Sequence, residues 1–300
     1  MSSKGSKHGL AHLDQSNTRQ ISDDYAGPVL VCDIDKTYLS THFSSFRGLL
    51  SIPFELAIDK EPIPGIVPLL RALRRGPGTE SALTPLYFVS GSPVQLRPVI
   101  EKRMVLDGID FDGITFKDQL GLLLSGRPRA IKEQIGYKLT ALLLYFEEVS
   151  KQARWLLFGD DVEQDADVFV LFSRVASGFR GAELERWLKS NRVSKKDIRA
   201  IMPIAERLPV VEDPVDGIFI HLERGRAPAS FEDSRIYPTR SYLQTAFLMA
   251  QREIIEPMAV GAVARDLRLR GTSDDELREQ SDDAQKRFGI DDDVVKLAFG

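Results

Sequence analysis

The sequence Val29-Leu-Val-Cys32-Asp33-Ile-Asp35-Lys-Thr37 contains the clearest indication of the fold. Four consecutive apolar residues, two of them β-branched, lead directly into two aspartates separated by one residue. A short continuous apolar run of this kind is typical of a strand that is buried on both faces of a parallel sheet. Ligands bind beyond the carboxyl ends of such strands, so the two aspartates lie where a binding site is expected.

Three further apolar runs end in polar residues in the same way. They are Pro85–Val89 before Ser90, Trp155–Phe158 before Asp160, and Gly217–Ile220 before His221. A weaker run, Gly113–Phe116, predicts another strand. Helical patterns separate these strands, at Ile66–Arg74, Pro93–Val105 and Lys138–Lys151. The second helix is expected to begin at Ser92 as its N-cap. Strands that alternate with helices predict an α/β fold, a doubly wound parallel sheet with helices on both faces.

The length of 300 residues suits one large domain with an appendage. Residues 1–24 are polar and lack periodicity, and we predict that they form a disordered tail. The α/β domain is predicted over residues 25–257, with a polar helical insert at about 181–209. Residues 258–300 are predicted to form a helical C-terminal appendage.

The composition argues against several classes of protein. The net charge is −4, with 40 basic and 44 acidic residues, so the chain has no nucleic-acid footprint. No run approaches the roughly 20 apolar residues of a transmembrane segment, and the N-terminus lacks the apolar run of a secretory signal. The single cysteine, Cys32, rules out an intramolecular disulfide framework and is predicted to be buried on its strand. These features predict a cytoplasmic protein.

Four short elements with polar side chains occur in a fixed order. They are Asp33-x-Asp35-x-Thr37, Ser90, Lys138, and Gly159-Asp160-Asp161-x-x-x-Asp165. Phosphoryl transfer through an aspartate needs one carboxylate to attack phosphorus and another group to protonate the leaving oxygen. It also needs a hard cation held by oxygens, and an ammonium and a hydroxyl that bind the phosphate oxygens. The four elements supply these groups.

The segments DIDKT, FVSGSP, Lys138 and GDDVEQD resemble the four motifs of the haloacid dehalogenase superfamily. The resemblance implies a Mg²⁺-dependent phosphomonoester hydrolase that works through a phospho-aspartate intermediate. It implies that Asp33 is the nucleophile and Asp35 the general acid/base, and that Asp33, the Asp35 backbone carbonyl and Asp160 bind Mg²⁺. It further implies that Ser90 and the Gly91 amide bind phosphate and that Lys138 stabilises the phospho-aspartate. Thr37 would support the loop of the first motif. Asp165 would either bind the metal directly or hold the metal ligands in position.

A narrower resemblance covers roughly residues 29–172 and 217–223. The segments PLYFVSGSPVQLRPVI, FKDQL and WLLFGDDVEQDADVF, with the Lys138 helix between the last two, resemble the phosphatidate phosphatases of the actin-patch-protein family. The sequence departs from that family at Lys36, where an acidic residue is usual, and in the helical segment 181–209. The resemblance implies a phosphorylated substrate that is a lipid, phosphatidate, or another large molecule. A soluble small-metabolite phosphoester is the alternative.

Several alternatives stay open at this point. Lys132 competes with Lys138 as the lysine of the site, Ser90 is also a typical turn residue, and Asp165 suits the first turn of a helix. His221 is interpreted as a strand-end histidine, and the residues after the first motif as a packed loop: His42, Phe43, Phe46 and Arg47. A non-catalytic phosphate-binding scaffold, a phosphomutase or a phosphonatase would use the same core. A two-component receiver domain fits poorly, because its acidic pair precedes a separate phosphorylated aspartate.

No large cap domain is predicted over the site. The intervals 38–84 and 94–137 must already supply helices and strands, and what remains is too small for an independent core. An open site would accept a phosphate on a large molecule, such as a lipid headgroup at a membrane surface. Peripheral contact with an anionic membrane would then need a local basic patch, for which Arg71–Arg75 is the candidate.

Overall fold

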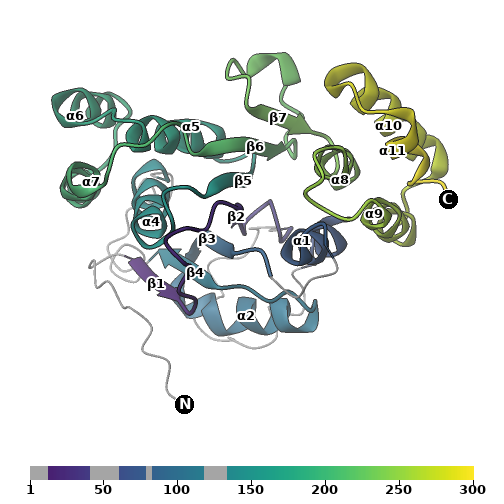
Figure 1. The fold of residues 1–300 in the computed structure, drawn as a ribbon, viewed down its shortest axis with the longest axis horizontal. Coiled ribbons are helices and arrows are strands. Elements are labelled where there is room, and N and C mark those ends of the chain that lie inside the picture. The colour runs from purple at the N-terminus through teal and green to yellow at the C-terminus, as the bar shows by residue number, and fades with distance from the viewer. Residues whose placement is uncertain (1–12, 41–60, 79–82, 118–133) are drawn as a thin grey trace, which may run out of the picture.

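The computed structural model describes residues 13–40, 61–78, 83–117 and 134–300. In this part of the chain seven strands form one sheet, in the spatial order β1-β4-β3-β2-β5-β6-β7 (Figure 1). The strands are β1 (Leu13–Asn17), β2 (Pro28–Asp33), β3 (Leu86–Pro93), β4 (Gly113–Lys117), β5 (Arg154–Asp160), β6 (Val215–His221) and β7 (Ile236–Thr239). Neighbouring strands are parallel, except that β1 is antiparallel to β4. The predicted α/β fold with a mostly parallel sheet is confirmed.

Helices flank this sheet on both sides. They are α1 (Ile66–Arg75), α2 (Arg97–Leu106), α4 (Ile135–Glu148), α5 (Asp165–Ala176), α6 (Gly181–Ser190), α7 (Lys195–Arg207), α8 (Tyr242–Gln251), α9 (Met258–Leu269), α10 (Asp274–Phe288) and α11 (Asp292–Lys296). Figure 1 shows α4, α6 and α7 on the left of the sheet and α1, α8 and α9 on the right. The segment predicted as a helical insert corresponds to α6 and α7.

Side chains of the central strand β2 alternate between two hydrophobic layers. Val29 and Val31 pack into the layer that contains α4, α5, α6 and α7. Leu30 and Cys32 pack into the layer that contains α1, α2, α8 and α9. This is the two-sided burial that the apolar run predicted, and it leaves the strand ends as the place for polar side chains.

The N-terminal strand β1 corrects one prediction. Residues 1–24 were expected to be disordered, but residues 13–17 pair with β4, from Leu13 opposite Lys117 to Asn17 opposite Gly113. A short polar segment becomes a strand when an existing sheet edge satisfies its backbone groups, and nothing in the local sequence indicates that edge. The last strand, β7, was not predicted either.

The start of the second predicted helix is also different. Strand β3 continues to Pro93, which pairs with Lys117 of β4, and α2 begins only at Arg97 after a 3-10 turn at Val94–Leu96. Ser92 therefore lies within the strand and is not an N-cap. The extra strand pairing outweighs the local capping signal, and it changes the direction of the Ser92 hydroxyl.

The C-terminal region is helical, as predicted, and packs against the sheet domain. Val260 and Val263 of α9 and Leu277 of α10 lie in the same hydrophobic layer as α1 and α8. A capping box of Ser273 and Glu276 begins α10. The division of the chain into a domain and an appendage stays a prediction.

One arginine of the predicted basic patch Arg71–Arg75 is buried, whereas Arg71 and Arg75 are exposed, so the patch as a docking surface stays a prediction. Arg74 is 6% exposed and forms ion pairs with Asp110 and Asp112. The Asp112 carboxylate also accepts a hydrogen bond from the Leu86 amide at the start of β3. These contacts place the end of α1 at the amino-terminal edge of the sheet, opposite the edge where β2 ends in Asp33.

Five residues considered from the sequence lie outside the described part of the chain: His42, Phe43, Phe46, Arg47 and Lys132. The described residues of the two intervals considered for a cap form α1, α2 and β4, so the absence of a large cap stays a prediction. Among the described helices, none combines the length and apolar character that crossing a membrane requires.

Candidate functional site

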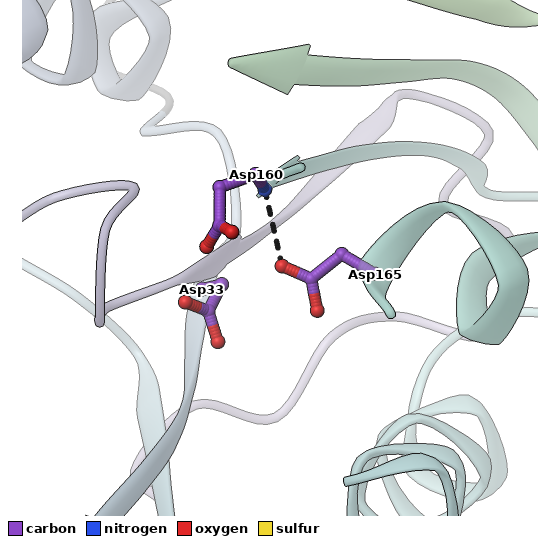
Figure 2. Close-up of side chains that lie close together, drawn as sticks. All are labelled: Asp33, Asp160 and Asp165. Atoms are coloured by element: carbon purple, nitrogen blue, oxygen red, sulfur yellow. Dashed lines mark hydrogen bonds between the residues drawn. The ribbon is translucent and has the colours of Figure 1, made fainter. Parts of the chain in front are cut away.

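Three aspartates meet at the carboxyl edge of the sheet. Asp33 is the last residue of β2, Asp160 the last residue of the neighbouring β5, and Asp165 the first residue of α5. One carboxylate oxygen from each lies within 4.8 Å of the others, and all three residues are buried. Figure 2 shows the three side chains directed toward one another. Parallel strands bring residues that are far apart in sequence to one edge, as the sequence predicted.

The turn after β5 is held by these side chains themselves. Asp160 Oδ1 accepts hydrogen bonds from the amides of Val162 (2.5 Å) and Glu163 (2.9 Å). Asp165 Oδ2 accepts one from the Asp160 amide at 3.1 Å, drawn as the dashed line in Figure 2. A Cβ at Gly159 would lie 2.5 Å from the Asp165 Cβ, so this position requires glycine. The turn therefore fixes two carboxylates relative to β2.

Lys138 enters the same cluster from the first turn of α4. Its Nζ lies 2.7 Å from Asp33 Oδ1 and 2.6 Å from Glu163 Oε2, and it also pairs with Asp165. The lysine is 1% exposed. The structure thus brings Lys138 to Asp33, while the competing Lys132 lies outside the described residues. Glu163 was not singled out from the sequence, although it stands two residues before Asp165 in the same segment.

The cluster contains more negative than positive charge. Burial raises the pKa of Asp33 well above its usual range, and Asp165, Glu163 and Asp160 raise it further against the effect of Lys138. Burial, with Asp165 next, raises the pKa of Asp160 to about 8. Burial lowers the pKa of Lys138, but Asp165, Asp33 and Glu163 outweigh it, and the net shift is well upward. Four carboxylates face one ammonium group, so a further cation would stabilise their ionised forms.

The arrangement fits a hard metal ion. Both carboxylate oxygens of Asp33 are buried and accept no hydrogen bond of suitable geometry within the described residues, although Lys138 lies near one of them. Buried polar atoms are normally satisfied, so two such oxygens on one carboxylate point to a missing partner. Oxygen donors from several carboxylates are what Mg²⁺ and Ca²⁺ prefer. The residues Asp33, Asp160 and Asp165 could therefore hold a metal ion.

Asp35 faces a different part of the site. Its carboxylate accepts hydrogen bonds from the hydroxyls of Ser90, at 3.0 Å, and Ser92, at 2.9 Å. All three residues are buried. Ser92 was interpreted as a helix cap, but it lies on the same side of β3 as Ser90, two residues further along. No local sequence signal identified it, because only the continued pairing of β3 with β4, across an irregularity between Ser90 and Pro93, keeps it in the strand.

In the loop after β2, the side chains of Asp35 and Thr37 point in different directions. Between them Lys36 adopts a left-handed backbone conformation, with φ of 66°. Asp35 is directed to β3, whereas the Thr37 hydroxyl donates a long hydrogen bond of 3.5 Å to Asp160 Oδ2 at the end of β5. Left-handed conformations are uncommon outside glycine, and they concentrate at functional sites.

Helix α8 supports this loop from the C-terminal part of the chain. The Tyr242 hydroxyl donates to the Thr37 carbonyl oxygen at 2.5 Å, and its ring stacks on His221 with centroids 4.9 Å apart. His221 ends β6 opposite Asp160 of β5. It lies at a strand end, as predicted, next to Asp160 across the sheet. No local sequence signal connected Tyr242 to the first motif, because 205 residues separate it from Thr37.

Asp161 lies next to Asp160 but outside the cluster. Its carboxylate accepts hydrogen bonds from the backbone amides of Arg224, at 2.7 Å, and Arg226, at 2.9 Å. It therefore holds the turn after β6 and is not directed to Asp33. Of the two consecutive aspartates in this segment, only the first belongs to the cluster.

The metal-free protein is expected to lose stability as the pH rises. An unfolded Asp160 would titrate near about 3.9, whereas the folded pKa is about 8. Between these values the folded state holds a proton that the unfolded state has released. The free energy of unfolding therefore falls with rising pH, by at most about 1.4 kcal/mol per pH unit for this group. Thermal unfolding in EDTA from pH 5 to pH 8 measures the effect. An Asp160→Asn variant should show a shallower fall, and equal slopes for the two proteins would contradict the role given to Asp160.

Comparison with known protein families gives a match over half of the chain. The family model described as "Phosphatidate phosphatase APP1, catalytic domain" matches residues 29–178. The matched segment runs from β2 through α5 and contains the whole cluster of Asp33, Lys138, Asp160 and Asp165. No curated protein and no solved structure matches the chain.

Proposed function

Since this chain belongs to the family of the phosphatidate phosphatase APP1 catalytic domain, we propose that it is a Mg²⁺-dependent phosphomonoester hydrolase of the haloacid dehalogenase type. One observation carries the proposal. Asp33 ends the central strand with a buried carboxylate that accepts no hydrogen bond among the described residues, within reach of Lys138 and two further aspartates. Once a cation balances the cluster, such a carboxylate can attack phosphorus.

In the proposed reaction Asp33 acts as the nucleophile and Asp35 as the general acid and base. A carboxylate oxygen of Asp33 attacks phosphorus, the bond from phosphorus to the ester oxygen breaks, and Asp35 gives its proton to the leaving oxygen. Asp35 then takes a proton from the water that attacks the phospho-aspartate, which restores both carboxyl groups. The hydroxyls of Ser90 and Ser92, at 3.0 and 2.9 Å, support this role because they hold the Asp35 carboxyl in one orientation.

The cation and phosphate sites are proposed from the same cluster. Mg²⁺ would be held by Asp33, the Asp35 backbone carbonyl and Asp160. Asp165 would either bind the ion directly or hold these ligands in position. A bound Mg²⁺ supplies positive charge that neutralises phosphate oxygens. On substrate binding the Ser90 hydroxyl would turn from Asp35 to a phosphoryl oxygen beside the Gly91 amide, while Ser92 keeps its hydrogen bond to Asp35. Lys138 would stabilise the phospho-aspartate, and Thr37 would support the loop. The 2.7 Å approach of Lys138 to Asp33 supports the lysine's role.

The proposed substrate is phosphatidate or another large phosphorylated molecule. Family membership favours phosphatidate. The described parts of the two intervals where a cap would be inserted are occupied by α1, α2 and β4, which supports an open site. We further propose a cytoplasmic protein that contacts membranes only peripherally, and whose helices after residue 258 form an appendage to the phosphatase domain.

Removal of the metal tests the proposal most directly. EDTA is expected to stop hydrolysis of p-nitrophenyl phosphate, and added Mg²⁺ is expected to restore it. Ca²⁺ should not restore it, because its larger and more variable coordination shell holds the reacting groups less closely. Initial rates at matched free metal concentrations measure this. Full activity in EDTA would exclude the metal-dependent mechanism, and comparison of phosphatidate vesicles with soluble sugar phosphates would identify the substrate class.

A further inference from the structure

A buried tyrosine beside the cluster has a hydroxyl without a partner. Tyr137 precedes Lys138 in the first turn of α4 and is 0% exposed. Its hydroxyl makes no hydrogen bond within the described residues. A buried hydroxyl that stays unpaired costs free energy, so most are satisfied by protein, water or ligand. The hydroxyl is therefore available to a partner from outside the described residues, such as a bound ligand.

The position of the hydroxyl shows where that partner would lie. A Cβ built on Gly91 would lie 2.7 Å from the Tyr137 hydroxyl and 3.9 Å from Gln134 Nε2, so the hydroxyl lies against the Gly91 backbone. Gln134 in turn donates to Glu163, which accepts from Lys138 Nζ. The hydroxyl thus lies between the end of β3 and the Lys138 cluster, beside the proposed phosphate site.

The hydroxyl has charges of both signs near it: Lys138 on the one hand, and Glu163, Asp33 and Asp165 on the other, whose negative charge the proposed Mg²⁺ would balance. The ammonium group of Lys117, at the end of β4, lies 5.0 Å from the centroid of the Tyr137 ring, and Lys117 is itself 6% exposed. Burial raises the pKa of Tyr137 well above its usual value, so the hydroxyl stays protonated and can donate. A neutral donor next to a lysine side chain suits the negatively charged oxygens of a phosphate.

From this geometry we infer that the Tyr137 hydroxyl donates a hydrogen bond to a phosphoryl oxygen of the bound substrate, next to the groups supplied by Ser90 and Gly91. The inference rests on the proposed function, because it adds a residue to the same phosphate site. It assigns a binding role to the residue before the lysine, outside the set of residues that the motifs indicated.

The substitution Tyr137→Phe tests the inference, because it removes only the hydroxyl. Loss of one hydrogen bond to a charged group corresponds to about a 10- to 100-fold change in affinity. We expect the dissociation constant of inorganic phosphate, measured by calorimetry in the presence of Mg²⁺, to rise by that factor. The KM for p-nitrophenyl phosphate should rise in parallel. The melting temperature should stay the same or rise, because the variant no longer buries an unpaired hydroxyl.

Tyr145→Phe is the matched control on the same helix. Tyr145 is also 0% exposed, but its hydroxyl lies 2.9 Å from the Thr115 hydroxyl, with which it shares a hydrogen bond. This variant should lower the melting temperature and leave phosphate affinity unchanged. Removal of a hydroxyl that binds phosphate lowers the phosphate affinity and does not lower the melting temperature, whereas removal of a structural hydroxyl lowers the melting temperature and not the affinity. Equal phosphate affinity of wild type and Tyr137→Phe would overturn the inference.

The phosphate-binding measurement tests this inference independently of the proposed reaction, because calorimetry does not require turnover. Weaker phosphate binding by Tyr137→Phe supports the inference even if the wild-type protein hydrolyses no phosphomonoester, in which case only the proposed reaction fails. Normal turnover in the wild type with unchanged affinity in the variant removes only the inference.

Discussion

Replacement of Asp33 by asparagine is expected to abolish phosphomonoester turnover, with a loss of about 10⁴-fold or more in kcat. An amide cannot form the phosphorylated intermediate, and no other described carboxylate takes the same position at the end of β2. The fold should tolerate the change. Burial and three neighbouring carboxyl groups already raise the pKa of Asp33, so a neutral side chain removes repulsion while Lys138 keeps Glu163 and Asp165 as partners. The rate with p-nitrophenyl phosphate and the melting temperature measure the two effects.

Asp161→Asn is the control for this experiment. It makes the same chemical change beside Asp160, but its carboxylate binds the backbone of the turn after β6 at 2.7 and 2.9 Å. Turnover in this variant should stay within a few-fold of the wild type. Wild-type rates in Asp33→Asn would falsify the phospho-aspartate mechanism, whereas a loss in both variants would indicate general damage to the strand ends.

Replacement of Lys138 by methionine is expected to destabilise the protein strongly. Methionine preserves the buried aliphatic stem but leaves Asp33, Glu163 and Asp165 without their common cation. Removing one partner from a buried ionic cluster typically costs about 3–5 kcal/mol. In a chain of this size that corresponds to a decrease in melting temperature of about 5–15 °C. The decrease should be larger at pH 8 than at pH 5, because the unpaired carboxyl groups can take up protons at the lower pH.

Lys189→Met is the matched control for Lys138→Met. Lys189 pairs with Glu185 on the surface of α6, and its side chain is 62% exposed. Exposed pairs of this kind contribute little, so its melting temperature should change by no more than about 2 °C. Added Mg²⁺ should restore part of the stability lost in Lys138→Met, since a cation would again balance the carboxylates. Equal melting temperatures of the two variants would contradict the structural role of the buried cluster.

The regular part of the fold was predictable because its signal is local. The four apolar residues before Asp33 and the run before Asp160 became the adjacent parallel strands β2 and β5. A strand buried on both faces must be apolar at every position, so it can be recognised from a continuous run of apolar residues. The strand β1 was missed because its polar residues are held by pairing with β4, a partner about 100 residues away in the chain.

The candidate site was predictable where residues stand next to a strand end. Asp33, Ser90 and Asp160 follow predicted strands, and the parallel sheet brings them to one edge. Ser92 was misinterpreted because a serine before proline is a common helix cap, and only the continued pairing of β3 with β4 keeps it in the strand. Glu163 and Tyr242 gain their positions from the turn after β5 and from helix α8.

By itself, the sequence determined the alternation of buried strands and helices and the identity of the side chains at the strand ends. Both depend on neighbouring residues, since hydrophobic periodicity fixes which face is buried and where it stops. The tertiary structure decided how these side chains are charged and paired. Lys138 meets Asp33 because α4 packs across β2 and β3, and the Tyr242 hydroxyl reaches Thr37 because α8 covers the opposite face of the sheet. Their electrostatic effect depends on burial and distance, which exist only once the layers have packed.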